Sequence, residues 1–213
     1  MENHDVKQVE QRIKRYWYSD GIAELVTGGL FAFLGLYFGI QAYFGEGSQV
    51  SVILQVSMIL PIMAGVFAVR WLVNTLKARL TYPRTGYVEY RLNDHDVRQR
   101  RLVIVAVALA LGIASMVLID YIRSLDALVL GTGLLAGLIF IALRGRSSGV
   151  KRFYALGGLS IVLGIILSFS SLSQTFNLAL FYGFLGIVII LSGGLALRRY
   201  LNENPMPAEN SNG

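Results

Sequence analysis

The chain has 213 residues, of which 54% are hydrophobic and only 15% are charged, whereas a soluble domain carries about a quarter charged residues. It contains no cysteine, which excludes disulfides, thiolate metal sites and cysteine nucleophiles. The formal net charge is +6, but the basic residues gather at the ends of apolar runs. We therefore expect them to contact anionic lipids of the inner leaflet and not nucleic acid.

Apolar segments dominate the sequence from residue 22 onward. About 20 apolar residues are needed to cross the hydrocarbon core of a bilayer, and six runs come close to or exceed this length. They predict an all-α integral membrane protein in which residues 22–201 form a single bundle of six transmembrane helices. The runs are Ile22–Phe44, Val50–Val73, Leu102–Ile119, Ala127–Leu143, Phe153–Phe169 and Leu178–Leu197.

The positive charges predict the orientation of this bundle. Threading the six runs through a membrane places 18 of the 19 Lys and Arg residues on one side and only Arg123 on the other. Because cytoplasmic loops are enriched in Lys and Arg, we expect a multi-pass protein of the plasma (cytoplasmic) membrane. Both termini are then cytoplasmic.

Three segments outside the lipid complete the predicted organisation. Residues 1–21 are expected to be a cytoplasmic segment, with apolar side chains at helical spacing that form a short amphipathic surface helix. The second helix should run to about Leu80 and stop there, because Pro83 disfavours a helical conformation at Tyr82. The cytoplasmic loop between helices 2 and 3 spans about residues 74–101. Residues 202–213 lack an apolar period and are expected to be disordered.

The loop between helices 2 and 3 has aromatic residues interleaved with arginine. Residues 86–92 alternate in the manner of a strand, so the loop can contact lipid headgroups or dock a cytoplasmic protein along a strand edge. The candidate lipid-binding or partner-binding residues are Tyr82, Arg84, Tyr87, Tyr90 and Arg91.

Glu24 is the most informative single side chain, because it lies one turn inside the first helix. A charge in lipid costs about 2.5–3.5 kcal/mol or more, so Glu24 should face protein. Arg70, at a matching depth on helix 2, is the expected partner, with Asn74 on the same helix face. This candidate polar cluster binds an ion or proton, or forms an inner gate, or serves only to hold the helices together.

Pro61 lies midway along the second run. It removes the hydrogen bond to the Ser57 carbonyl and should kink the helix there. The freed carbonyl could line a polar cavity. The structural interpretation, in which neighbouring helices satisfy the backbone, is favoured.

Glycines in the helices indicate close packing. Gly35 and Gly39, and likewise Gly133 and Gly137, form GxxxG pairs, which favour close helix contacts within one bundle. A homo-oligomer through the Gly-rich helices is the second interpretation. Recurring Leu-Gly-aliphatic segments would also fit a threefold repeat of helical hairpins, or coincidence in an apolar sequence.

No catalytic pattern is present in the sequence. The two histidines, His4 and His95, lie outside the apolar runs, and none of the common catalytic or phosphate-binding motifs occurs. We therefore predict no catalytic residues, no metal site and no cofactor. The predicted function is a non-enzymatic membrane scaffold or subunit that docks a cytoplasmic partner through its basic 2–3 loop. The alternative is a small transporter or channel for an apolar or small solute, which would use Glu24, Arg70 and the Pro61 kink.

Overall fold

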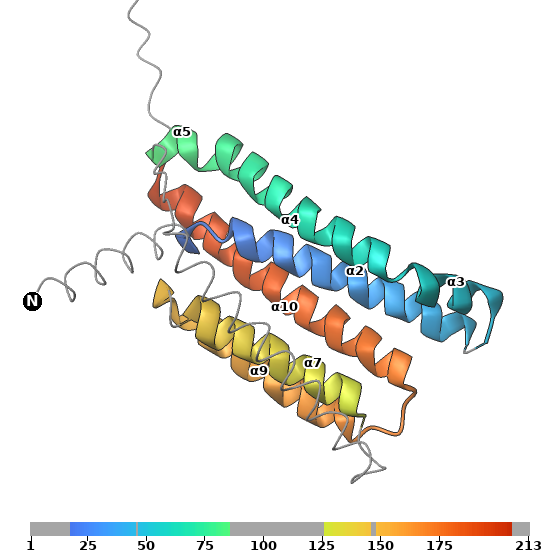
Figure 1. Cartoon of the computed structure of the whole chain (residues 1–213). Helices are drawn as coiled ribbons and strands as arrows, with labels where there is room; N and C mark the ends of the chain where they lie inside the picture. Colours follow the sequence, from blue (N-terminus) through green and yellow to red (C-terminus); the bar gives the residue numbers. More distant parts are fainter. Residues whose placement is uncertain (1–17, 46, 86–125, 146–147, 206–213) are drawn as a thin grey trace, which may run out of the picture.

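The computed structural model describes residues 18–45, 47–85, 126–145 and 148–205, and these residues are helical, with no strand among them. The helices run nearly side by side as one elongated bundle (Figure 1). They are α2 (Ile22–Phe44), α3 (Gln49–Ser57), α4 (Ile59–Leu80), α5 (Tyr82–Thr85), α7 (Ala127–Leu138), the π-helical segment η1 (Ile139–Gly145), α9 (Lys151–Ser168) and α10 (Gln174–Glu203).

Four of these helical segments are long and apolar enough to cross a membrane. They span Ile22–Phe44, Ile59–Arg84, Lys151–Ser168 and Gln174–Glu203, and Ala127–Ala142 is a shorter apolar helix. The all-helical class predicted from the sequence is therefore confirmed for the described residues, and four of their helices have the length and apolar character that a membrane span needs. The count of six spans and the orientation stay predictions. The predicted third run, Leu102–Ile119, lies outside the described residues, as do the amphipathic segment up to residue 17 and the strand-like residues 86–92.

The helix boundaries match the apolar runs closely, with three differences. The second run is divided between α3 and α4, with Met58 between them. Tyr82 is helical, contrary to expectation, because Thr81 ends α4 and Pro83 occupies the first turn of a new helix, where its missing N–H costs nothing. The last helix extends through Asn202 and Glu203, two residues into the segment that was predicted to be disordered.

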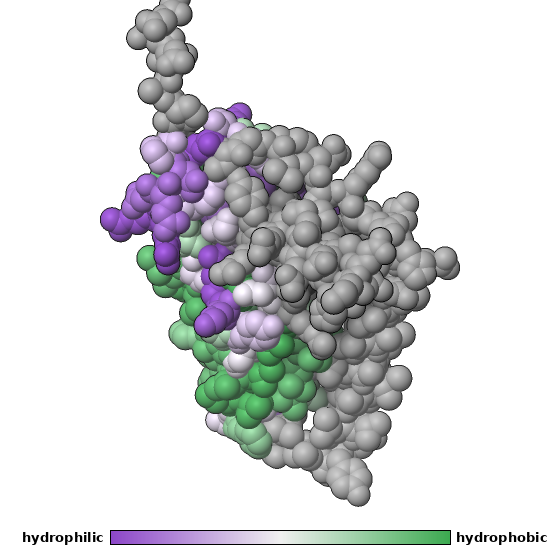
Figure 2. Space-filling model, turned by 90° about the vertical axis from the view of Figure 1, so that its left-hand side faces the viewer, coloured by the Kyte–Doolittle hydropathy of each residue, from purple (hydrophilic) through white to green (hydrophobic). Residues whose placement is uncertain are grey.

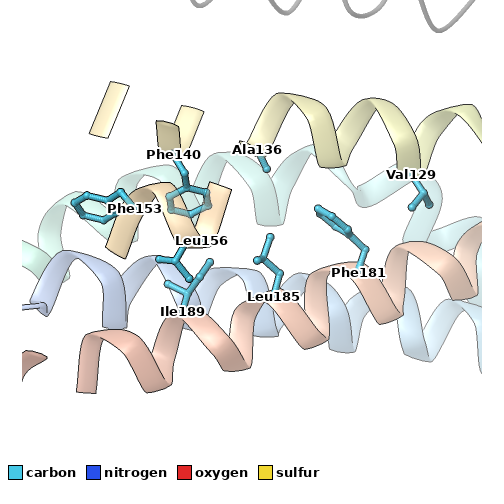
Figure 3. Close-up of a cluster of buried hydrophobic side chains, with 8 residues drawn as sticks. All are labelled: Val129, Ala136, Phe140, Phe153, Leu156, Phe181, Leu185 and Ile189. Atoms are coloured by element: carbon cyan, nitrogen blue, oxygen red, sulfur yellow. The ribbon is translucent and has the colours of Figure 1, made fainter. Parts of the chain in front are cut away.

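The bundle is built in layers. In Figure 1, α2 lies between α4 and α10, and the α7–α9 pair lies on the other side of α10. The largest buried apolar cluster of the described residues lies where side chains from α7, η1, α9 and α10 meet (Figure 3). It consists of Val129, Ala136, Phe140, Phe153, Leu156, Phe181, Leu185 and Ile189.

Glycine allows the helix backbones to approach closely within each pair. A Cβ on Gly28 of α2 would lie 2.7 Å from the Ile190 nitrogen of α10, and one on Gly35 would lie 2.5 Å from the Gly183 nitrogen. A Cβ on Gly133 of α7 would lie 2.7 Å from the Cα of Gly164 on α9. Lipid supplies no hydrophobic force between helices, so close backbone contact of this kind is what holds them together. The predicted GxxxG glycines Gly35 and Gly133 thus pack within the chain.

The helix surfaces that face away from the bundle are apolar. On α10, for example, Phe184, Ile187, Leu191 and Leu195 are all more than half exposed and recur every three or four residues. A soluble protein rarely leaves such a continuous stripe open to water. The stripe is what a lipid-facing helix requires.

All Lys and Arg residues of the described part of the chain lie toward one end of the bundle, where α2 and α9 begin and α4, α5 and α10 finish. We call this the basic end. Figure 2 views the molecule from this end and shows hydrophilic residues gathered in its upper part, with hydrophobic residues covering the helices below. The polar groups that could carry function are concentrated there.

Candidate functional site

Glu24 is fully enclosed by protein at the basic end. Gly21 takes a left-handed φ of 70° directly before α2 and packs against α10, which places Glu24 one turn into the helix and against both α9 and α10. The Arg152 Nε donates a hydrogen bond of 2.6 Å to Glu24 Oε1, and the Ser192 hydroxyl donates one of 3.0 Å to Oε2. Both carboxylate oxygens are therefore occupied, and three helices are joined through one side chain.

Arg152 is held from several sides. Besides Glu24, its guanidinium donates to the Tyr18 carbonyl oxygen, and it lies 5.7 Å from the centre of the Phe153 ring. The side chain is 26% exposed while Glu24 is 1% exposed. The ion pair therefore sits just inside the basic end, with its cation toward the surface.

The prediction that Arg70 is the partner of Glu24 is wrong, because Glu24 pairs with Arg152. Arg70 forms no ion pair with any other described residue. It lines a separate cavity together with Asn74. The sequence places several arginines at a similar depth, and nothing in their spacing shows that Arg152 of α9, and not Arg70 of α4, bonds Glu24.

A second buried ion pair, which sequence reasoning missed, joins α2 to α4. Lys77 Nζ lies 3.0 Å from Asp20 Oδ2, with side-chain exposures of 2% and 1%. The Thr81 hydroxyl donates to the same oxygen at 3.1 Å, and Asp20 Oδ1 accepts the Ile22 N–H at 3.2 Å. The sequence places Lys77 one helical turn before the predicted end of helix 2, but nothing in its spacing pairs it with Asp20.

Arg144, near the end of η1, contacts the first part of α2 at the basic end. Its Nη2 donates to the Thr27 hydroxyl at 3.3 Å, and its guanidinium carbon lies 5.7 Å from the Phe140 ring centre and 5.9 Å from that of Phe153. Its Nη1 is buried and has no hydrogen-bond partner among the described residues. A buried donor on a cation that stays unsatisfied is costly.

Between α2, α4 and η1 lies a partly open cavity of about 390 Å³. Its lining combines two guanidinium groups, an amide and hydroxyls with apolar side chains. The lining residues are Tyr18, Ala23, Thr27, Val69, Arg70, Val73, Asn74 and Arg144. Two members of the predicted polar cluster, Arg70 and Asn74, thus lie together, and the third, Glu24, belongs to the neighbouring ion pair.

The predicted kink site lies near the junction of α3 and α4, away from the basic end. Pro61 is the third residue of α4, and the helix is interrupted at Met58, one turn before it. The Tyr37 hydroxyl donates to the Leu54 carbonyl oxygen and lies 3.2 Å from the Ser57 hydroxyl. A side chain of α2 therefore satisfies the Leu54 carbonyl at the break, whereas the interpretation of Pro61 concerns the Ser57 carbonyl and stays a prediction.

The start of the 2–3 loop is attached to the bundle. Arg84 of α5 donates a 2.8 Å hydrogen bond to the Asn204 carbonyl oxygen after α10, and Tyr82 lies in the same short helix. The remaining candidate loop residues, Tyr87, Tyr90 and Arg91, lie outside the described residues.

At the end opposite the basic end, one polar cluster joins three helix ends. Asp126 caps α7 through the Val129 N–H at 3.3 Å, and its other oxygen accepts from Asn177 Nδ2 at 3.1 Å. The Asp126 N–H in turn donates to the Ser168 carbonyl at 2.9 Å. Every strong acceptor of this cluster is used in holding helix ends, which indicates a structural role.

In the part of the chain that the structure describes, no group of three or more His, Cys, Asp or Glu side chains could hold a metal ion. Comparisons with protein-family models, with curated proteins and with solved structures found no match to this chain. Function must therefore be argued from the basic end itself.

Proposed function

We propose that the protein is a six-helix plasma-membrane protein with the basic end, and both termini, in the cytoplasm. The described Lys and Arg residues all lie toward one end of the helices, and in the whole sequence 18 of 19 fall on that side of the predicted spans. The positive-inside rule supports this orientation.

We propose that this protein acts as a non-enzymatic membrane scaffold or subunit that docks a cytoplasmic protein through the 2–3 loop. The observation that carries the proposal is the fixed departure point of this loop. Thr81 is bonded to Asp20, which directly precedes α2 and its cap Gly21, and Arg84 is bonded to the backbone after α10. A fixed departure point lowers the entropic cost of binding a partner through the loop.

The test compares two deletions of equal size in the full-length protein. One lacks residues 86–92 of the loop, and the other lacks residues 207–213 of the C-terminal segment. After crosslinking in cells, we expect one soluble protein to be joined to the intact chain and to the tail deletion, and to be lost from the loop deletion. An identical crosslinking pattern for all three chains would contradict docking through the loop.

A small transporter remains the second candidate, and the helix break at Met58 is the observation that favours it, since broken helices often line transport pathways. Weighing against it, both oxygens of Glu24 are already bonded. Solute uptake into liposomes that is abolished by Glu24→Gln, in a variant that retains its fold, would replace the scaffold proposal with transport.

A further inference from the structure

The residues that line the cavity between α2, α4 and η1 include two arginines and no carboxylate. Asp20 and Glu24 are the two buried carboxylates at this end, and each is already paired, with Lys77 and with Arg152 respectively. All four of their oxygens accept hydrogen bonds. Arg70 and Arg144, the two arginines that line the cavity, make no ion pair within the described residues.

The geometry of Arg144 adds a second, independent reason to expect an anion. One of its two terminal nitrogens is bonded to Thr27, and the other is buried without a partner. Planar guanidinium groups bind phosphate oxygens through two parallel N–H donors. The free donor of Arg144, the Arg70 guanidinium and the Asn74 amide all belong to residues that line the cavity, and each can donate to a phosphate oxygen.

The face of α4 that lines the cavity continues into apolar surface. Phe67, Arg70, Trp71 and Asn74 follow the spacing of residues that share one helix face, and Phe67 and Trp71 are 68% and 67% exposed. A ligand with an anionic head and an apolar tail could therefore place its phosphate between the arginines and its chains along α4. A free phosphate ion would leave this apolar surface unused.

We propose that the cavity is a binding site for the phosphate headgroup of an anionic phospholipid. Basic pockets between transmembrane helices bind such headgroups in general, and the cavity of about 390 Å³ can accommodate one. The site goes beyond the scaffold function and does not depend on it, because lipid binding can be measured without any protein partner.

The test uses the full-length protein in a mild detergent and a phosphatidylglycerol as the probe, with bound lipid counted by native mass spectrometry. The double variant Arg70→Gln with Arg144→Gln should weaken binding at least about tenfold, because hydrogen bonds to charged groups are the strongest of their kind. The matched control is Arg79→Gln with Arg198→Gln, which removes the same charge from exposed positions at the same end and should bind phosphatidylglycerol as the wild type does.

A single variant guards against misfolding. Arg70 is exposed and makes no ion pair with a described residue, so Arg70→Gln should fold normally and still bind the lipid about fivefold more weakly. Equal losses in the pocket and control double variants would overturn the proposal, since they would indicate diffuse attraction to the basic end. Displacement of the lipid by inorganic phosphate at equal concentration would also overturn it, in favour of a soluble phosphate site.

Discussion

At the scale of single residues, the basic end is organised by buried carboxylates whose oxygens are fully bonded. Glu24 joins α2, α9 and α10 through Arg152 and Ser192, and Asp20 joins α2 and α4 through Lys77 and Thr81. A buried charge that loses its partner is strongly unfavourable. These two residues therefore fix how the helix ends are arranged.

Glu24→Gln should destabilise the protein, because Arg152, only 26% exposed, would lose its charged partner. We expect a loss of about 3 kcal/mol, the lower part of the range for breaking a buried pair, measured by unfolding in mixed detergent and SDS micelles. Adding Arg152→Gln to this variant should recover part of the loss, because no uncompensated charge then remains.

The matched control is Glu203→Gln, which breaks an ion pair between two exposed side chains on α10. Exposed pairs contribute little, so this variant should unfold as the wild type does. If Glu24→Gln unfolds no more easily than Glu203→Gln, the proposed role of the buried pair is wrong.

At the scale of elements, adjacent glycines have opposite roles. In the Gly-Gly-Leu sequences of α2 and α9, the first glycine is packed against a neighbouring helix and the second faces open space. On α2 these are Gly28, whose added Cβ would meet backbone atoms of α10, and Gly29, whose added Cβ would meet nothing within 4 Å. A backbone cannot move aside as a side chain can.

Gly28→Ala should therefore force α2 and α10 apart and cost about 1–3 kcal/mol, the usual penalty of overpacking. Gly29→Ala should be neutral or slightly stabilising, since alanine favours a helix over glycine by about 1 kcal/mol. The same micelle unfolding assay measures both variants. Similar losses for the two would mean that α2 does not pack on α10 through Gly28.

Tyr37 should support the break between α3 and α4, because its hydroxyl bonds the Leu54 carbonyl. Tyr37→Phe should remove about 1 kcal/mol of stability and speed hydrogen exchange of the amides around residue 58. Tyr43, which is 86% exposed, provides the control: Tyr43→Phe should leave exchange at these amides unchanged. Unaltered exchange in Tyr37→Phe would show that the break needs no support from α2.

The residues at which single helices begin and end could be predicted from the sequence better than the side-chain contacts between helices. The first run, Ile22–Phe44, coincides with α2, because polar residues and glycines bound an uninterrupted apolar segment. The partner of Glu24 could not be predicted, since Arg70, Arg144 and Arg152 all lie near the same depth and helix adjacency is set by packing. For the same reason the Asp20–Lys77 pair, which bridges helices distant in sequence, left no local signal.

At the scale of the whole molecule, the described helices have one end rich in Lys and Arg and an opposite end held by the Asp126 and Asn177 cluster. The sides between them are apolar. This division is what a bilayer requires of a multi-pass protein. The proposed lipid site and the proposed docking loop both belong to the basic end, so both depend on which side of the membrane that end faces.

Orientation is measured most directly by single-cysteine labelling, because the native chain contains no cysteine. Lys151→Cys marks the basic end and Gln49→Cys the opposite end, and both positions are exposed. In right-side-out membrane vesicles, a membrane-impermeant maleimide should label Gln49→Cys at once and Lys151→Cys only after permeabilisation. Labelling of Lys151→Cys in sealed vesicles, with Gln49→Cys protected, would contradict a basic end in the cytoplasm.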